Sequence, residues 1–389
     1  MPRPRLLFLI TEDWYFWTHR CAIARAAQAA GFEVIVATRV QKHGSLIRGA
    51  GFRLIPIRLR RRSRNPIQEL LAIAELAAIY RRERPAIVHH VTIKPVLYGT
   101  WAAALAGVPA VVNALAGLGH AFVAQGWRAL ALKRLIIFAY RTTLGLERSR
   151  VIFQNPEDRE AFVHNGIVAA DKAILIRGAG VNLAEFCMRP EPDGTPVVML
   201  AGRLLWSKGV KELIEAAELL RARNVPCRVV LVGVPDLDNP NSVEEETLRT
   251  WQRDGVVEWW GRREDMPDVL AQSNVVVLPT TYGEGVPKIL LEAAAIGRAI
   301  VATDVPGCRE IVKHGENGLL VPAGDVSRLA AAMGELLENP AQRARMGRRG
   351  REIVQAEFAE EQIVAQTLAV YHTLLGEQSP GKFKLAQEP

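Results

Sequence analysis

The chain has 389 residues, of which 49% are hydrophobic and 23% are charged, a balance typical of soluble globular proteins and not of disordered ones. This length exceeds what one hydrophobic core usually serves, so two domains are expected. The four cysteines lie far apart with no Cys-x-x-Cys pair, which argues against a zinc site or a disulfide framework and fits a reducing cytosol.

Positive charge is concentrated in the first half of the chain. Residues 1–185 contain 26 Lys and Arg against 12 Asp and Glu, a balance of +14, whereas the remainder contains 23 against 29, a balance of −6. The densest basic run comprises Arg58, Arg60, Arg61, Arg62 and Arg64. This asymmetry predicts a polyanionic surface partner, with an ordinary solvated basic face as the alternative. The chain shows no zinc-finger spacing and no aromatic RNA-binding box, so anionic lipid is preferred to nucleic acid.

Two apolar stretches resemble, at first sight, a signal peptide and a membrane-spanning segment. Residues 6–10 are too few for a signal peptide and lead into Glu12 and Asp13, so they predict a first strand. Residues 95–127 contain no Asp, Glu, Lys or Arg, but prolines and glycines divide them into short pieces. We therefore expect a buried helix, a strand and a glycine-rich loop there instead of a membrane span.

Strands and helices alternate along the first half, as in a doubly wound parallel sheet. Apolar residues at 67, 70, 71, 74, 77 and 78 recur with the period of a helix. The expected strands are 6–11, 33–37, 54–57, 87–90, 111–113 and 150–154, and the expected helices are 18–30, 66–80, 96–106 and 127–144.

The alternation restarts after residues 186–196, which contain three prolines and a glycine and predict a linker. The predicted divisions are residues 1–187, 188–357, a final helix at 358–377 and a tail at 378–389. The expected strands of the second half are 197–201, 228–232, 256–259, 275–279 and 299–303, and its helices are 209–223, 241–254, 265–272 and 287–297.

The segment from Glu284 to Glu292 is the most informative in the chain. A loop leads from the strand at 275–279 into a helix that opens with Pro287, a residue favoured in the first helical turn. Ligands of open α/β sheets bind at the carboxyl ends of strands, and free N–H groups at a helix N-terminus suit a diphosphate. One carboxylate is expected over the strand end and the other on the helix behind it.

This Glu-x7-Glu pattern resembles that of glycosyltransferase family 4, and so does the Gly202-Arg203-x4-Lys208-Gly209 segment about eighty residues before it. Either pattern alone is weak, but the two together, in this order and each after a strand, are specific. The resemblance implies the GT-B fold, in which two Rossmann-like domains face each other and the final helix crosses back to the first. It also implies retaining transfer of a hexose or N-acetylhexosamine from a nucleotide-diphospho-sugar, with no metal or other cofactor.

The resemblance also assigns roles on the donor side. Arg203 and Lys208 are expected to contact the diphosphate, where charge develops as the sugar leaves. The expected roles of the others are the donor sugar for Glu284, the ribose hydroxyls for Glu292, and backbone N–H contacts to the diphosphate for Gly285, Val286 and Lys288. Asp236-Leu237-Asp238 formally reads Asp-x-Asp, but its context differs from that of a metal motif.

The acceptor side is less determined. The loop at 115–120 resembles one in polysaccharide-assembly members of the family, which makes His120 the first candidate for an active-site histidine. Glu12, Asp13, His90 and Lys94 are further candidates for the acceptor side. A lone histidine is more often structural. The aromatic segment at 11–20 departs from the family's usual Gly-Gly loop, so the phosphate contacts of that loop cannot be carried over.

The subgroup it resembles assembles surface polysaccharide or lipid-linked glycan, as in addition of N-acetylgalactosamine to diacetylbacillosaminyl-diphospho-undecaprenol. This implies a UDP-sugar donor, a polyprenyl-diphosphate-linked acceptor and a peripheral position on the inner face of the cytoplasmic membrane. Anionic lipid would then explain the basic first half. The alternatives are a GT-B enzyme with a soluble acceptor and a catalytically silent membrane-associated scaffold.

Overall fold

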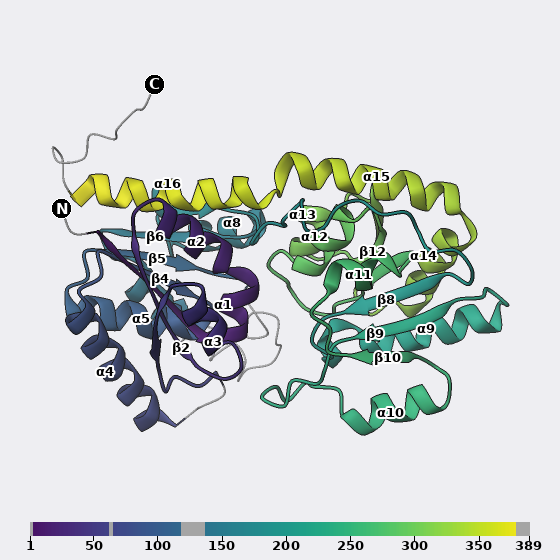
Figure 1. The fold of residues 1–389 in the computed structure, drawn as a ribbon, viewed down its shortest axis with the longest axis horizontal. Coiled ribbons are helices and arrows are strands. Elements are labelled where there is room, and N and C mark those ends of the chain that lie inside the picture. The colour runs from purple at the N-terminus through teal and green to yellow at the C-terminus, as the bar shows by residue number, and fades with distance from the viewer. Residues whose placement is uncertain (1–2, 62–64, 118–136, 379–389) are drawn as a thin grey trace. The chain divides into compact units, whose positions relative to one another are not determined.

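The computed structural model describes residues 3–61, 65–117 and 137–378. They belong to two compact units, each drawn with its own sheet in Figure 1. Of the described residues, the first unit comprises 3–61, 65–116, 137–176 and 363–378, and the second comprises 117 and 177–362. The expected tail lies outside the described residues from position 379 onward.

The first unit contains a seven-stranded parallel sheet in the order β3-β2-β1-β4-β5-β6-β7. Leu6 and Phe8 of β1 enter one core cluster while Leu7 and Leu9 enter another, so the sheet is covered on both faces. Its strands are β1 (Arg5–Glu12), β2 (Glu33–Arg39), β3 (Arg53–Pro56), β4 (Ile87–Val91), β5 (Ala110–Ala114), β6 (Ser149–Phe153) and β7 (Ala173–Leu175). Its helices include α1 (Asp13–His19), α2 (Cys21–Ala29), α3 (Gly44–Gly49), α4 (Pro66–Glu83), α5 (Ile93–Ala106) and α8 (Pro156–His164).

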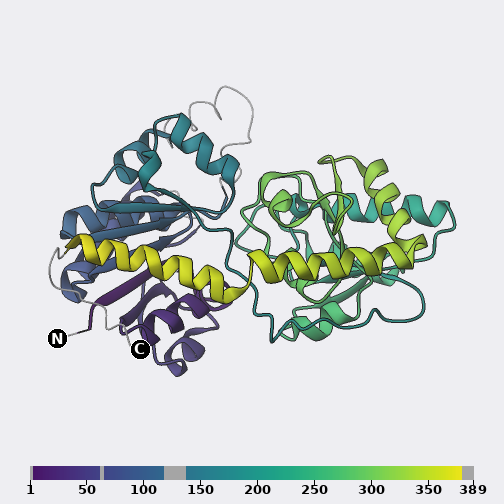
Figure 2. The same ribbon diagram turned by 90° about the horizontal axis from the view of Figure 1, so that it is seen from above.

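The last helix, α16 (Glu360–Gln378), belongs to the first unit from Ile363 onward. It buries Ile363 and Tyr371 in the same cluster as Leu6 and Phe8, and Figure 2 shows it running along this unit. The hydroxyl of Tyr371 lies 2.5 Å from Nδ1 of buried His89 on β4. The chain thus returns to its first unit at its end.

The second unit contains a six-stranded parallel sheet in the order β10-β9-β8-β11-β12-β13. Its strands are β8 (Val197–Ala201), β9 (Arg228–Val232), β10 (Glu258–Gly261), β11 (Val275–Leu278), β12 (Ala299–Thr303) and β13 (Gly318–Val321). Its helices are α9 (Val210–Ala222), α10 (Glu245–Arg253), α11 (Met266–Ala271), α12 (Lys288–Ala295), α13 (Pro306–Ile311), α14 (Val326–Glu338) and α15 (Pro340–Glu357). Two parallel sheets of this kind confirm the predicted GT-B fold class.

One predicted helix differs from the structure, and another is described only in part. The single helix expected at 18–30 is two helices, α1 and α2, because Arg20 between them has φ −131° and breaks the helical path. Residues 13–17 of the aromatic segment, which precede the expected helix, are helical as part of α1. The expected 127–144 helix is described only from residue 137, where residues 137–144 are helical.

The strand order in each sheet reverses at one point, between β1 and β4 in the first unit and between β8 and β11 in the second. Connections leave in opposite directions at such a point, which opens a crevice at the carboxyl ends of the strands. The segments after β8 and β11 carry Arg203, Lys208 and Glu284. Those after β1 and β4 carry Asp13 and Lys94. Within the described residues, no helix is both long enough and apolar enough to cross a membrane.

Candidate active site

Glu284 lies at the centre of the polar cluster at the β8/β11 switch point. Its Oε1 accepts a hydrogen bond from Nζ of Lys208 at 2.5 Å and another from Oγ1 of Thr280 at 3.1 Å. The side chains of Lys208 and Glu284 are only 18% and 11% exposed. The structure therefore brings two of the predicted donor-side residues together as a largely buried ion pair.

Two hydrogen bonds to one carbonyl connect the loops that carry this pair. The carbonyl oxygen of Ser207 accepts from Oγ1 of Thr280 and from the backbone N–H of Thr281, each at 3.0 Å. Gly209 follows with φ +80°, and a Cβ there would lie 2.0 Å from the carbonyl oxygen of Pro279. The loop after β8 can approach β11 this closely because residue 209 is glycine.

The charges of the cluster influence one another. Burial alone lowers the pKa of Lys208, but the nearby Glu284 and Tyr282 raise it, and the net pKa lies above the ordinary value for lysine. Arg203 acts on Lys208 in the opposite sense, as expected of a second cation nearby. Arg203 itself donates to Asp236 at 2.8 Å. Lys208 is thus held in its charged form, which suits binding of an anion.

Glu292 lies on the second turn of α12, with Oε1 3.3 Å from Nζ of Lys288 one turn earlier. Its side chain is buried. Burial raises the pKa of Glu292 above the ordinary glutamate value, although Lys288 opposes that shift. The carboxylate is therefore costly in the unliganded protein, and hydroxyl donors on a ligand would stabilise its charged form.

The backbone from Glu284 to Pro287 is held in place by glycines of neighbouring segments. A Cβ on Gly307 would lie 1.4 Å from the carbonyl oxygen of Gly285, and a Cβ on Gly178 would lie 3.0 Å from the Cβ and Cγ1 atoms of the Val286 side chain. Any residue with a Cβ at position 307 would collide with this loop, so the close approach requires glycine there. The N–H groups assigned to a diphosphate thus belong to a segment fixed by packing.

At the switch point of the first unit, two carboxylates contact the segment after β2. Oδ2 of Asp13 accepts from the backbone N–H groups of Gln41 and His43 at 2.6 and 2.8 Å, and Oε2 of Glu12 accepts from Nε2 of Gln41 at 3.0 Å. Both carboxylates are buried. Lys94 donates to the Glu69 carboxylate and to the carbonyl of Arg60, each at 2.9 Å. Gln41 therefore contacts both Glu12 and Asp13, whereas Lys94 binds the segment that leads into α4 and α4 itself.

His90 has an interior position. It is fully buried, with Nδ1 2.8 Å from Oδ1 of Asn113 and Nε2 3.1 Å from the hydroxyl of Tyr80. Burial lowers the pKa of His90 to about 4. Nothing in this geometry supports the acceptor-side role predicted for His90, and its contacts are those of a core residue. His120 lies outside the described residues.

Sequence reasoning missed two members of the cluster, Thr280 and Asp236. Thr280 lies two residues after the end of β11, so its position behind a buried apolar strand was an available signal. Asp236 belongs to the Asp-x-Asp triplet, which was considered only as a metal motif, and it pairs with Arg203. Among the described residues there is no group of three His, Cys, Asp or Glu side chains placed to hold a metal ion.

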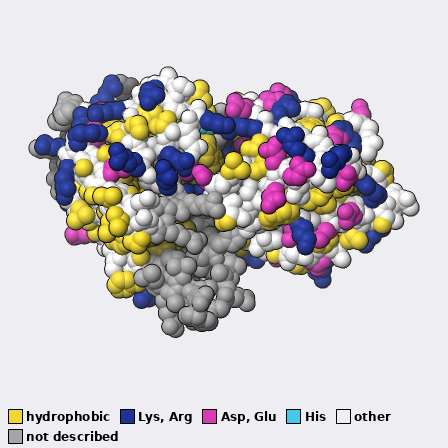
Figure 3. Space-filling view, turned by 90° about the horizontal axis from the view of Figure 1, so that it is seen from below, with side chains coloured by type: hydrophobic (Ala, Val, Ile, Leu, Met, Phe, Trp, Pro, Cys, Tyr) yellow, Lys and Arg dark blue, Asp and Glu magenta, His cyan; other side chains and the backbone are white. Residues whose placement is uncertain are grey.

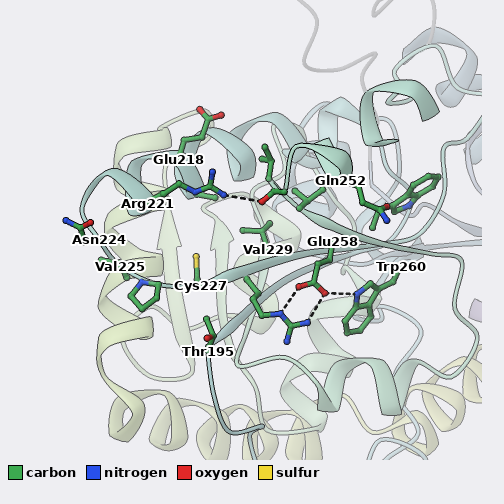
Figure 4. Close-up of a pocket in the computed structure, with 17 residues that line it drawn as sticks. Thr195, Glu218, Arg221, Asn224, Val225, Cys227, Val229, Gln252, Glu258 and Trp260 are labelled. Atoms are coloured by element: carbon green, nitrogen blue, oxygen red, sulfur yellow. Dashed lines mark hydrogen bonds and ion pairs between the residues drawn. The ribbon is translucent and has the colours of Figure 1, made fainter. Parts of the chain in front are cut away.

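A hollow of about 820 Å³ lies elsewhere in the second unit, at the amino ends of β9 and β10 (Figure 4). Two of its charged side chains bind one another. Arg228 donates twice to Glu258, at 2.6 and 2.7 Å, and Trp260 donates to the same carboxylate at 3.3 Å. Because ligands of parallel sheets bind at the carboxyl ends, we take the β8/β11 cluster and not this hollow as the candidate active site.

Comparison with known proteins agrees with the geometry. Two family models match the chain, one described as "Glycosyl transferase 4-like" over residues 5–155 and one as "Glycosyl transferases group 1" over residues 195–339. The chain is 28% identical over 375 residues to the N,N'-diacetylbacillosaminyl-diphospho-undecaprenol alpha-1,3-N-acetylgalactosaminyltransferase of Campylobacter jejuni, a match covering 93% of this chain and 96% of that enzyme.

Two further similarities extend the comparison. The chain is 28% identical over 280 residues to the UDP-Gal:alpha-D-GlcNAc-diphosphoundecaprenol alpha-1,3-galactosyltransferase of Escherichia coli, which covers 69% of this chain and 70% of that enzyme. Among solved structures, the Anabaena protein HepE in complex with UDP and glucose superimposes with a TM-score of 0.78 at 19% identity. That match covers 95% of this chain and 99% of HepE, and it shows a shared fold.

Replacing Gly209 by alanine should destabilise the second unit. The added Cβ meets the Pro279 carbonyl and also needs a left-handed backbone, so we expect a loss of about 2–4 kcal/mol in the free energy of unfolding. Gly194→Ala is the matched control, because Gly194 has φ +92° but no heavy atom within 4 Å of an added Cβ. Urea unfolding measures both. Equal losses would show that the contact with Pro279 is unimportant.

Glu292→Gln should make the unliganded protein more stable at neutral pH. A folded-state pKa above the unfolded value gives stability that is complete below the unfolded pKa and is lost as pH rises through the folded pKa. The gain from Gln should therefore shrink in acid, where Glu292 is protonated. Thermal unfolding across pH tests this, with Glu264→Gln, at a side chain 82% exposed, as the control. A less stable Glu292→Gln variant at neutral pH would contradict this account.

Proposed function

The chain belongs to the glycosyltransferase family that these two models describe, and from this premise we propose a retaining glycosyltransferase that uses a UDP-sugar and a lipid-diphosphate-linked sugar acceptor. The transferred group is a hexose or N-acetylhexosamine. The observation that carries the proposal is the cluster of Lys208, Glu284 and Thr280 at the β8/β11 switch point, with Arg203 beside it.

Each donor-side residue has a task in this reaction. Breaking the anomeric C–O bond leaves charge on the diphosphate, which Arg203 and Lys208 stabilise together with backbone N–H groups of Gly285, Val286 and Lys288. Glu284 accepts hydrogen bonds from the donor sugar and holds Lys208 in position before the donor arrives. Glu292 accepts hydrogen bonds from the ribose hydroxyls. No metal is assigned a task.

The choice of UDP is supported by two names. HepE was crystallised with UDP and glucose, and the Escherichia coli relative is named for UDP-Gal. The lipid-diphosphate acceptor is supported by the names of the Campylobacter jejuni and Escherichia coli relatives, both of which act on diphospho-undecaprenol-linked sugars. Such an acceptor lies in a membrane, so the proposal includes a peripheral position on the inner face of the cytoplasmic membrane, where anionic lipid would attract the basic first half.

On the acceptor side, the first-unit switch point offers Glu12, Asp13 and Lys94. His120 is proposed to position the transferred sugar. His90 supports this region from inside, because its ring joins Asn113 on β5 to Tyr80 on α4. We assign His90 no contact with substrate.

A nucleotide-sugar panel tests the donor. UDP or a UDP-sugar at 100 times its Kd should add about 2.7 kcal/mol to the free energy of unfolding, read as a rise in Tm. Release of UDP should then require a polyprenyl-diphosphate-linked sugar. Stabilisation by GDP-sugars alone would refute the donor assignment, and equal turnover with free sugar phosphates would refute the lipid acceptor.

Lys208→Ala and Arg203→Ala should each lower turnover by roughly a hundredfold or more, the scale of losing one preorganised contact to the developing charge. Lys211→Ala is the matched control, because Lys211 lies on the next helical turn with a side chain 67% exposed. Turnover and Kd for UDP are measured for all three variants. Near-normal turnover in both cluster variants would remove these cations from the reaction.

A further inference from the structure

Helix α4 has an apolar stripe that faces away from the protein. Ile67, Leu70 and Leu71 are 69%, 67% and 64% exposed, and Ala74 and Ala78 farther along are exposed as well. With 3.6 residues per turn these five positions fall within an arc of about 100°. The opposite face is already packed, since it buries residues 72, 76, 77, 79 and 80.

Basic side chains flank both ends of this stripe. Arg58 and Arg60 precede α4 and are exposed, and Arg81 and Arg82 occupy its last turn. From residue 58 to 82 the acidic residues are Glu69 and Glu75. Lys94 contacts Glu69 at 2.9 Å, and Glu75 accepts from the backbone N–H of Arg58 at 3.2 Å. The segment 58–75 carries five arginines against these two glutamates.

A contiguous apolar patch between cations is typical of helices that lie in a membrane interface. Figure 3 shows hydrophobic and basic side chains lying together on the first unit, where acidic ones are few. Three aliphatic side chains offer far less area than the roughly 1,200 Å² that stable protein–protein interfaces bury. The charge and the small apolar area both favour lipid over a second protein chain.

We propose that the outward stripe of α4, residues Ile67, Leu70 and Leu71 with the arginines at 58, 60 and 61, docks on an anionic lipid bilayer and inserts its aliphatic side chains. This docking rests on the proposed function, because a lipid-linked acceptor brings the enzyme to a bilayer. Insertion of the stripe adds a hydrophobic contribution to membrane binding, beyond the attraction between arginines and anionic lipid. Salt screens the arginines but leaves the burial of aliphatic side chains in place.

Vesicle co-sedimentation tests the stripe. The wild-type chain should bind vesicles of phosphatidylglycerol and phosphatidylcholine tightly at low salt and still detectably at about 1 M salt, where the screening length is about 3 Å. The combined variant Ile67→Gln, Leu70→Gln and Leu71→Gln should bind at least tenfold more weakly at low salt and not detectably at high salt. Gln keeps a good helix propensity, and unchanged thermal unfolding will show that the fold is intact.

Two control variants separate the contribution of the aliphatic side chains to vesicle binding from that of the arginines. Leu237→Gln changes a leucine that is 88% exposed in the second unit and should leave vesicle binding unchanged. Replacing Arg58, Arg60 and Arg61 by Gln should weaken low-salt binding while leaving high-salt binding near the wild-type level. Unchanged binding of the stripe variant overturns the proposal. So does a dimer that the stripe variant alone disrupts while its vesicle binding stays normal.

A transfer assay with a short-chain, water-soluble diphosphate acceptor keeps this inference distinct from the proposed function. The stripe variant should transfer sugar to that acceptor at the wild-type rate, since no bilayer is present. Absence of transfer by the wild-type chain would refute the proposed function, whatever the vesicles show. Normal transfer together with unchanged vesicle binding by the stripe variant would refute the docking surface alone.

Discussion

The ion pair between Lys208 and Glu284 is the interaction on which the candidate active site depends. It joins the loop after β8 to the loop after β11, two strands that pair directly in the sheet. Removing both charges from water is costly, and the attraction offsets this only with good geometry and further hydrogen bonds. The hydroxyl of Thr280 supplies such a bond. The pair contributes less to stability than to placement, because each charge is already desolvated and oriented when an anionic ligand arrives.

Buried carboxylates near the two switch points differ in how well neighbouring groups stabilise their charge. In the first unit, the carboxylate of Asp13 is bound by two backbone N–H groups of the same unit, so folding alone satisfies one of its oxygens. In the second, Glu292 is buried with Lys288 as its salt-bridge partner, and burial still raises its pKa. Burying a carboxylate with so few hydrogen-bond donors around it destabilises the folded protein, so folding alone does not explain its presence. Such costs are expected where a ligand supplies the missing donors, which favours Glu292 as a binding residue.

Buried strands could be predicted from the sequence, whereas the pairing of charged side chains could not. Buried parallel strands are continuous apolar runs, so β11 and β12 could be recognised directly. The residues predicted for the donor side were chosen because they follow such runs in two motifs that resemble those of glycosyltransferase family 4. Which charges pair could not be predicted, since Lys208 and Glu284 are 76 positions apart. His90 was a candidate because it ends a strand, but sheet register places it opposite Asn113, where its ring turns inward. Register depends on the whole sheet and leaves no local signal.

Helix α4 shows the limit of periodicity in physical terms. Its repeating apolar positions correctly predicted a helix, but the buried face is a different one, and both faces are apolar. A helix of this kind cannot be oriented from its pattern, because the face that packs is chosen by fit, here including the hydrogen bond between Tyr80 and His90. Once that face is packed, folding gains nothing from aliphatic side chains on the outside. The three exposed aliphatic side chains lie between arginines and contact water. Their burial lowers the free energy only where another apolar phase, such as the interior of a bilayer, replaces that water.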